Sequence, residues 1–399
     1  MGSLAEANTN FTVDLLKRME EEQSKNIFFS PFSISAALAM TCFGARVTLL
    51  LKWKSSQPPI YFVLQVLHFD KITGSRMSKS LPAQCDKPGG PHNQFKELLS
   101  AINQPSTNYT LSIANRLYGS NTFEFLQQYM ECIKDLYHAE LERVDFGNAP
   151  EEVRKKINSW VESQTNGKIK DLLPINSLGT ETILVLVNAI YFKGKWKRQF
   201  DSKDTHEADF WTSKEHSKKV QMMTQGGKFN YAKITSPPME VLELPYDVDL
   251  SMFILLPDKN GTTKEIVRQL TYEKFQDWTS STSMQNTEIE IFLPKFKMEE
   301  KYSFVSTLRK MGMKDVFNPG EADLSGMSGH RDLIVSEVLH KAYIEVNEEG
   351  TEAAAATAVI VAVTSAGRIP QFNANHPFLL IIRHNRSKSI LFAGKLSSP

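Results

Sequence analysis

The chain has 399 residues, a mass of 45.2 kDa and 41% hydrophobic residues, enough to bury a large core in one domain or in two or three small ones. Its formal net charge is +1, so electrostatics gives no argument for a nucleic acid or a membrane surface as partner. No run of about eighteen apolar residues occurs, so we expect no membrane-spanning segment.

The N-terminal residues predict an amphipathic helix. Ser3 and Glu6 are spaced as a capping box, and Phe11, Leu15 and Met19 follow at helical spacing. The same stretch lacks the basic start and the apolar core of a cleavable secretion signal. We therefore expect a cytoplasmic protein, which would reach the extracellular space only by a non-classical route that needs no signal peptide.

A second clear helix is predicted before residue 170. Val153, Ile157 and Val161 form an apolar stripe at helical spacing, which begins after Pro150 and stops before Gly167. Proline is favoured in the first turn of a helix and glycine after its last turn, so both ends of this helix are defined by the sequence.

Strands are predicted more often in the second half of the chain. TILVLVNAIYF, residues 182–192, is apolar almost throughout and predicts a strand buried on both faces. VLELPY, LSMFILLPD and EIEIFLPKF predict strands that end at prolines, a helix is predicted near Tyr302 to Gly312, and FLLIIRHNRSKSILFAGKL predicts a closing hairpin. Residues 71–94, rich in Gly, Pro, Ser and Lys, predict a mobile exposed loop. We expect one α+β domain over residues 1–399.

The cysteines predict neither a disulfide scaffold nor a metal site. Cys42, Cys85 and Cys132 are too few for such a scaffold, and they are not spaced as metal ligands. Cys42 lies in the apolar run AALAMTCFGA and is typical of a buried structural thiol. The count suits a reducing compartment, and we expect no metal and no cofactor.

Motifs for catalysis are incomplete. Residues 326–329, Gly-Met-Ser-Gly, resemble a nucleophile elbow only in part, because G-x-S-x-G needs glycine where His330 stands. His340 lies among apolar residues and is typical of a core histidine that is satisfied by hydrogen bonds. We therefore expect that the protein is not an enzyme.

Residues 350–370, GTEAAAATAVIVAVTSAGRIP, form a segment almost free of bulk and charge. In an extended strand its alternate residues take opposite faces. One face has no charge and nothing larger than valine: Thr351, Ala353, Ala355, Thr357, Val359, Val361 and Val363. Such a strand could enter an existing core with little steric resistance, and Gly350 supplies backbone freedom at its start.

Several motifs resemble one family. EVNEEGTEAAAAT, residues 345–357, resembles the hinge of inhibitory serpins, and FNANHPFLLIIRHN, residues 372–385, resembles the C-terminal signature of that family. NIFFSPFSISAALAM, LVNAIYFKGKW, LPKFKMEEKY, DLSGMSG and LHKAYIEVNEEG match further serpin landmarks in the same order. The match covers about residues 3–45 and 66–399.

The resemblance also points to a branch and a fold. APEEVRKKINSWVESQTNGKIKDLLP and EEGTEAAAATAV resemble the squamous cell carcinoma antigen branch of the ovalbumin-like clade. The implied structure is the serpin fold, an α+β domain with three β-sheets, about eight to nine helices and an exposed reactive-centre loop at about residues 345–371.

The resemblance implies a mechanism for the loop. In inhibitory serpins a protease cuts the loop, which then inserts as a strand into the main sheet. The cut falls fourteen residues after the hinge glycine, which implies a reactive bond between Thr364 and Ser365, with Val361 and Val363 as bait flanks. Arg368 is a trypsin-like alternative, where we expect cleavage without inhibition. The implied hinge consists of Glu349, Gly350, Thr351, Glu352, Ala353, Ala354, Ala355 and Ala356.

The implied partner is an endopeptidase. Small apolar side chains before the reactive bond suit an elastase-like serine protease, or a papain-like cathepsin that reads Val363. We expect a monomeric suicide-substrate inhibitor. The alternative is a non-inhibitory serpin, a binding or storage protein whose loop is cut without trapping the protease. Thr351 and residues 353–356 lack the proline, charge or bulk that such hinges tend to carry, which favours inhibition.

Other matching residues resemble conformational switches rather than catalytic groups. The resemblance assigns Ser33, Ser35, Asn188 and His340 to the shutter, a polar network beneath the main sheet that rearranges as the sheet opens. Trp196 matches the tryptophan of the breach, the place where the loop begins to insert. Plain core packing is compatible with each of these positions as well.

One segment departs from the family pattern. VTLLLKWKSSQPPIYFVLQ, residues 47–65, is longer and more apolar than the short polar helix expected there, and Pro58 and Pro59 would break that helix. If exposed, its apolar side chains would favour aggregation or a new partner. This departure counts against inhibitory competence and leaves the fold assignment unchanged.

Overall fold

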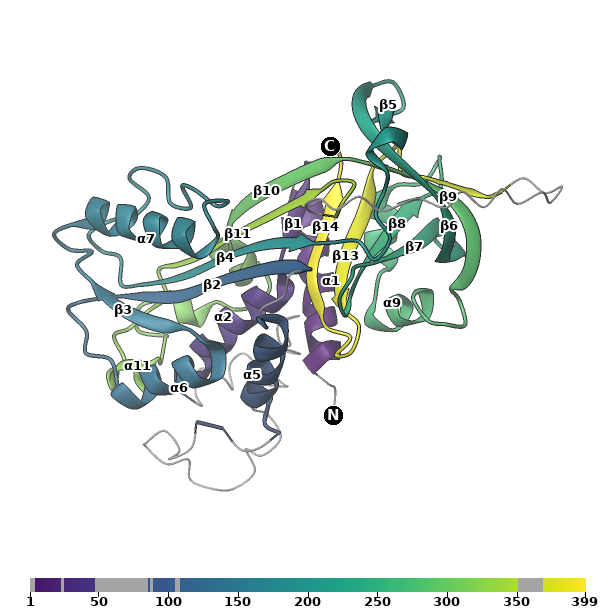
Figure 1. The fold of residues 1–399 in the computed structure, drawn as a ribbon. Helices are drawn as coiled ribbons and strands as arrows, with labels where there is room; N and C mark the ends of the chain where they lie inside the picture. Colours follow the sequence, from purple (N-terminus) through teal and green to yellow (C-terminus); the bar gives the residue numbers. More distant parts are fainter. Residues whose placement is uncertain (1–3, 23–24, 47–84, 87–88, 105–107, 351–368) are drawn as a thin grey trace.

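The computed structural model describes residues 4–22, 25–46, 85–86, 89–104, 108–350 and 369–399. Within these ranges the chain forms two β-sheets with helices packed against them (Figure 1). The atypical segment 47–65 and the loop positions 351–368, which include the expected reactive bond, lie outside the described residues.

The first sheet has five strands in the order β10 (Phe296–Ser303), β11 (Glu337–Val346), β4 (Leu184–Gly194), β2 (Tyr109–Ser120) and β3 (Glu140–Val144). β4 and β11 are parallel neighbours, with Glu337 opposite Val185 and Ile344 opposite Phe192. Every residue of β4 except Lys193 is buried, so the predicted two-faced burial is confirmed. Long apolar runs of this kind are typical of strands covered on both faces.

The second sheet has nine strands, joined through the long strand β6 (Ser217–Thr235). The path runs through β1 (Ile27–Phe29), β14 (Ile390–Leu396), β13 (Phe378–His384), β8 (Leu250–Pro257), β7 (Pro238–Pro245), β6, β9 (Gln285–Pro294) and β12 (Gln371–Asn373), and β5 (His206–Trp211) pairs with β6. The predicted strands and closing hairpin are confirmed. The third sheet implied by the resemblance is not separate among the described residues, because β6 pairs with β5 and β9 toward its start and with β7 toward its end.

Nine α-helices lie in the described ranges, in agreement with the expected number. They are α1 (Leu4–Glu22), α2 (Pro31–Gly44), α5 (Pro91–Ile102), α6 (Gln127–Tyr137), α7 (Pro150–Gln164), α8 (Thr263–Gln269), α9 (Tyr272–Trp278), α10 (Val305–Lys310) and α11 (Ser325–Ser328). Figure 1 places α7 on one face of the five-stranded sheet and α2, α5 and α6 on the other. None of the helices in these ranges is long and apolar enough to cross a membrane.

Two boundaries differ from the sequence prediction. The predicted loop 71–94 is wrong at its end, because α5 begins at Pro91, a residue that fits the first helical position. The helix expected near Tyr302 to Gly312 is shorter, because β10 continues to Ser303 and α10 occupies only Val305–Lys310. The α7 boundaries agree with their signals: Pro150 begins the helix, and the Gly167 amide returns to the carbonyl of Glu162 at 2.8 Å.

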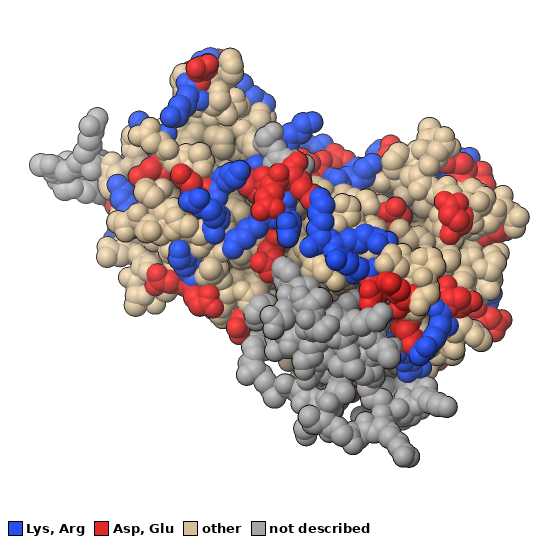
Figure 2. Space-filling model, turned by 180° about the vertical axis from the view of Figure 1, so that it is seen from behind, with Lys and Arg blue, Asp and Glu red and all other residues tan. Residues whose placement is uncertain are grey.

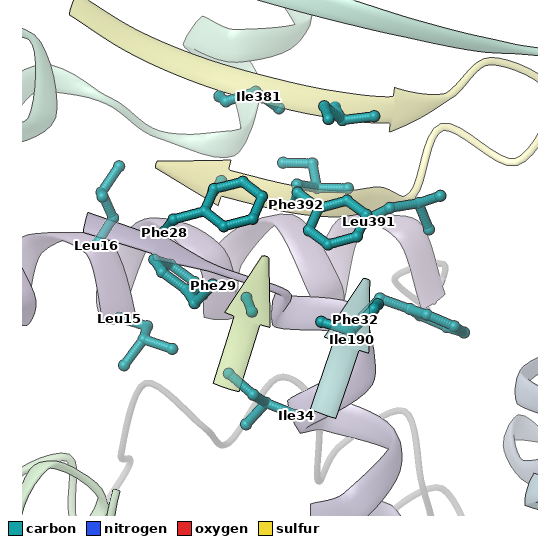
Figure 3. Close-up of a cluster of buried hydrophobic side chains, with 14 of the residues drawn as sticks. Leu15, Leu16, Phe28, Phe29, Phe32, Ile34, Ile190, Ile381, Leu391 and Phe392 are labelled. Carbon is teal, nitrogen blue, oxygen red and sulfur yellow. The ribbon is translucent and has the colours of Figure 1, made fainter. Parts of the chain in front are cut away.

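The five-stranded sheet separates two apolar clusters. The larger joins α1, α2 and the nine-stranded sheet; Figure 3 shows Leu16 of α1 beside Phe28 of β1, and Phe28 beside Phe392 of β14. The rings of Phe28 and Phe392 stack at 5.3 Å between centroids. The smaller cluster lies under α7, where Ile157 packs with alternate residues of β4. Burying each such side chain stabilises the fold by about 1.5–3 kcal/mol.

The cysteines show a feature that their spacing did not reveal. Cys85 and Cys132 form a disulfide that joins the residues before α5 to α6. A single disulfide is not a disulfide scaffold, which agrees with the prediction. Because disulfides persist mainly in oxidising compartments, it does not support the expected reducing compartment. Cys42 is free and buried as predicted, and burial raises the pKa of its thiol.

The surface carries both signs of charge. On the face opposite to Figure 1, lysine and arginine side chains lie next to aspartate and glutamate side chains (Figure 2). Many of these charges can pair, as Lys310 Nζ does with Glu22 Oε1 at 2.7 Å, because basic and acidic residues are almost equal in number. Interleaved charges are typical of a solvated surface.

Candidate functional site

The chain leaves β11 through a turn that is held against the residues after β4. The amide of Trp196 donates to the carbonyl of Glu349 at 3.1 Å, and the amide of Phe200 donates to that of Glu348 at 2.8 Å. The indole of Trp196 donates to the carbonyl of Asn347 at 3.0 Å. The start of the predicted hinge is therefore fixed beside the C-terminal end of β4 by hydrogen bonds from Trp196 and Phe200.

Trp196 itself is held by aromatic stacking. Its ring lies on Tyr246 with centroids 4.4 Å apart, and only 3% of the residue is exposed. A buried indole needs a partner for its N–H, and the carbonyl of Asn347 supplies it. Trp196 thus joins the start of the loop to the nine-stranded sheet.

Gly350 is confined by close backbone contact. Its φ is +77°, a conformation that favours glycine. A Cβ at this position would lie 2.4 Å from the carbonyl oxygen of Gly194 and 2.4 Å from the amide nitrogen of Trp196. Only glycine fits here without movement of the backbone, which gives the predicted hinge glycine a steric reason.

Glu348 forms the ionic contact of the hinge. Its carboxylate lies 2.9 Å from Nζ of Lys295, between β9 and β10, and accepts a hydrogen bond from Thr205 Oγ1 at 2.8 Å. Burial alone would raise the pKa of Glu348, but the hydrogen bonds from Lys295, its own backbone and Thr205 outweigh burial and lower it. The carboxylate therefore stays charged and holds three segments together.

A buried polar network crosses the boundary between β4 and β11. His340 of β11 lies opposite Asn188 of β4, and its Nδ1 bonds to Asn188 Oδ1. The amide of Ser30 donates to Nε2 of His340 at 3.1 Å, so Nε2 accepts and Nδ1 carries the proton. Asn188 Nδ2 donates to Ser33 Oγ on α2 and to Asn115 Oδ1 on β2. His340 is the hydrogen-bonded core histidine that the sequence predicts.

Not every expected member takes part in this network. Ser35 is buried on α2, but its Oγ has no hydrogen-bond partner in the described part of the structure. Sequence reasoning missed Asn115, a buried amide among the apolar residues of β2, and Ser30, the N-cap of α2. A polar residue inside an apolar strand was the available signal for Asn115. Glu348 and Lys295 were also missed, since charged residues on a surface turn are common.

The buried state of His340 predicts a pH dependence of stability. Burial lowers the pKa of His340 to about 3, from an ordinary value of 6.5. The unfolded chain gains a proton below pH 6.5 and the folded one does not, so this contribution is complete above about pH 6.5 and falls toward pH 3. At about pH 5 we expect a loss of about 2 kcal/mol relative to pH 7.

Urea unfolding at both pH values measures this loss. A His340→Gln variant lacks the titrating group and should show a smaller difference between pH 7 and pH 5 than the wild type. His216→Gln removes an exposed histidine and should behave as the wild type. Equal pH dependence in the His340→Gln variant and the wild type would contradict the assignment.

The geometry does not assemble a catalytic site from the candidate residues. Ser328 is buried, and its Oγ donates to the carbonyl of His330 at 3.1 Å. The hydroxyl of the partial elbow motif is therefore used to bond the turn that follows α11. The start of the hinge instead lies at the C-terminal end of the pair β4 and β11, and the polar network lies in the middle of that pair.

Comparison with known proteins decides the family. The family model described as "Serpin (serine protease inhibitor)" matches residues 6–399. The chain is a serpin. The sequence resemblance is thereby confirmed, and because serpins are a protease-inhibitor family, the expectation that the protein is not an enzyme is confirmed as well.

Individual relatives place this serpin more closely. Serpin B3 of Homo sapiens is 48% identical, and leukocyte elastase inhibitor of Equus caballus is 44% identical, with 100% of both chains covered in each case. The solved structure of uncleaved ovalbumin superposes with a TM-score of 0.86 at 37% identity, again over 100% of both chains. The ovalbumin-like clade named from the sequence is therefore confirmed.

Proposed function

We propose that this serpin is a suicide-substrate inhibitor of serine endopeptidases, with an elastase-like protease as the preferred target and papain-like cathepsins as a second class. Cleavage between Thr364 and Ser365 releases the loop, which inserts antiparallel between β4 and β11. The similarity to leukocyte elastase inhibitor, a protein whose name states its target, supports this choice.

One observation carries the proposal. β11 leads directly into the hinge, and its parallel neighbour β4 is bonded to it without an intervening strand. A strand that follows residue 350 and folds back between them would run antiparallel to both and would pair with both. Residues 351–364 reach roughly 46 Å when extended at about 3.3 Å each, which is enough to follow the whole of β11.

Energetics favour insertion of this particular segment. Each inserted residue gains ladder hydrogen bonds with a net value of about 1 kcal/mol, so the segment gains on the order of 10 kcal/mol. Its small side chains reduce the steric barrier to insertion. Insertion must be faster than hydrolysis of the covalent bond to the protease, since otherwise the protease is released intact.

The test is incubation with neutrophil elastase, cathepsin G and a papain-like cathepsin, followed by denaturing gel electrophoresis and intact mass. We expect an adduct with elastase that survives denaturation, and a released C-terminal peptide that begins at Ser365. A thioester adduct with a cathepsin can be labile, so residual protease activity is measured in parallel. Clean cleavage with no adduct and full protease activity would overturn the proposal and identify the non-inhibitory alternative.

A further inference from the structure

Four asparagines begin the pattern Asn-x-Ser/Thr, at which the enzymes of the secretory lumen attach N-linked glycans. They are Asn10, Asn108, Asn260 and Asn385, and no proline occupies the middle position of the pattern in any of them. A glycan is bulky and hydrophilic, so the folded chain can carry one only where solvent surrounds the asparagine side chain. The surroundings of the four side chains differ in this respect.

Two of the four patterns are packed into the fold. Asn10 is half-buried on α1, and the two residues that complete its pattern, Phe11 and Thr12, are fully buried. The Nδ2 of Asn385 donates to Ser251 Oγ at 3.0 Å, and the Oδ1 of Asn385 is buried. A glycan on either side chain would displace packed neighbours, so neither position suits one.

Asn108 lies immediately before β2, close to the residues that follow β4. Its carbonyl accepts a hydrogen bond from the amide of Lys195 at 2.9 Å, and its Nδ2 lies 3.5 Å from the carbonyl oxygen of Asp247. The residue is half-buried. A glycan on Nδ2 would separate the side chain from Asp247, so this position is also unfavourable.

Asn260 lies in the exposed turn between β8 and α8. Its side chain is exposed and makes no hydrogen bond within the described part of the chain. The turn is held by its backbone, because the amide of Asp258 donates to the carbonyl of Pro238 at 3.1 Å and the amide of Gly261 donates to that of Asp258 at 2.7 Å. A glycan on Asn260 would therefore extend into solvent from a fixed turn and displace nothing.

The disulfide between Cys85 and Cys132 independently favours the compartment in which such a glycan is attached. Disulfides form and persist in oxidising surroundings, which include the secretory lumen and exclude the cytosol. Cys132 on α6 is buried, with 1% of the residue exposed, so the bond belongs to the packed interior. A chain that acquires this bond as it folds is in the compartment that also modifies the asparagine pattern.

We propose that Asn260 is a site of N-linked glycosylation and that the chain folds in the secretory lumen. The donor is an oligosaccharide linked to a polyprenyl pyrophosphate. Asn260 Nδ2 forms a bond to C1 of the first sugar while the bond from C1 to the pyrophosphate oxygen breaks. The lipid pyrophosphate leaves with the electron pair of that bond, and one amide proton passes to a base of the transferase.

This route differs from the cytoplasmic site that the sequence analysis expects from the lack of a cleavable signal. The inference goes beyond the proposed function and leaves it unchanged. The turn of Asn260 belongs to the nine-stranded sheet, whereas the loop is proposed to insert into the five-stranded one.

The test expresses the full chain in cultured animal cells without an added signal peptide, and recovers the protein from the medium and from the cells. An amidase that releases N-linked glycans converts the linked asparagine to aspartate, which identifies the site in a peptide mass map. Wild type is compared with Thr262→Asp and Thr262→Ser. Thr262 is the N-cap of α8, and its Oγ1 accepts from the amide of Glu265 at 3.3 Å. Aspartate and serine both keep this cap, but only serine keeps the pattern.

We expect a glycan on Asn260 in wild type and in Thr262→Ser, and its complete loss in Thr262→Asp. The glycosylated molecules should also contain the peptide pair linked through Cys85 and Cys132 when the map is made without reductant. Circular dichroism verifies folding. If Thr262→Asp does not fold, Asn260→Gln removes the acceptor without a change in α8.

Wild type without a glycan in both the medium and the cells would overturn the proposal. A glycan found only on the other three asparagines would overturn the assignment to Asn260, and free Cys85 and Cys132 thiols in the glycosylated molecules would contradict the shared route. A glycan on Asn260 that persists in Thr262→Asp would show that the pattern is not what directs it, which also contradicts the proposal. None of these results depends on trapping of a protease, so the proposed function is tested separately.

Discussion

A Thr351→Arg variant is expected to be cut by its target protease without trapping it. Thr351 is the first residue after the hinge glycine, and in an extended strand it would fall on the face that carries no charge. If that face enters the core, the arginine charge would be buried without a partner, at several kcal/mol. We expect the number of inhibitor molecules consumed per inactivated protease to rise at least about tenfold, since 1.4 kcal/mol already changes a ratio of rates tenfold.

The control for this variant is Thr351→Val, which has the same shape without the hydroxyl and without charge. It should trap the protease as well as the wild type does. Titration of elastase with each protein, read as residual activity, gives the ratio directly. Unchanged trapping by Thr351→Arg would mean that residue 351 is not buried on insertion, and the proposed path of the loop would then be wrong.

The part of the fold that repeats simple patterns could be predicted from the sequence. β4 was predicted because an apolar run is flanked by polar residues, and α7 because its stripe, its proline and its glycine agree. Trp196 and His340 were placed by resemblance, and the structure gives both a physical role through their hydrogen bonds.

The remaining features depend on contacts between distant residues. Nothing in the sequence near Cys85 indicates that Cys132 is its neighbour, because the pairing results from the packing of α5 against α6. Lys341 is equally hidden: in the sequence it is one more lysine after a histidine, and only the topology places the carbonyl of Lys170 beside it. Local patterns predict elements, whereas contacts such as the Cys85–Cys132 disulfide and the bond from Lys341 to Lys170 appear only in three dimensions.

Polar contacts occur on both sides of the boundary between β4 and β11. His340 and Asn188 bond on the α2 side, Lys341 donates to the carbonyl of Lys170 in the segment after α7, and Glu348 with Lys295 fixes the start of the hinge. Each is polar and mostly buried, so each can be broken and replaced without loss of the apolar core. Under the proposed function, the sheet stays closed until the loop is cut and then opens, and contacts of this kind suit that change better than more hydrophobic area would.

Replacement of Gly350 by alanine is expected to destabilise the uncut protein by about 3 kcal/mol. About 1 kcal/mol comes from a β-carbon in a left-handed conformation, and about 2 kcal/mol from displacement of the backbone that the new atom would contact. That backbone is the carbonyl of Gly194 and the amide of Trp196, each 2.4 Å from the added carbon. The displacement should also weaken the bond from the Trp196 amide to Glu349, since both ends lie beside the clash.

Gly320 offers a matched control for this substitution. Its φ of +79° is nearly that of Gly350, but a Cβ there would meet no atom within 4 Å. Gly320→Ala should therefore lose only the conformational part, about 1 kcal/mol. Urea-unfolding midpoints of both variants against wild type separate the two contributions. Equal losses of unfolding free energy in the two variants would show that the backbone of residues 194–196 moves at no cost to accommodate the added carbon. Gly350 would then be required for its backbone conformation alone.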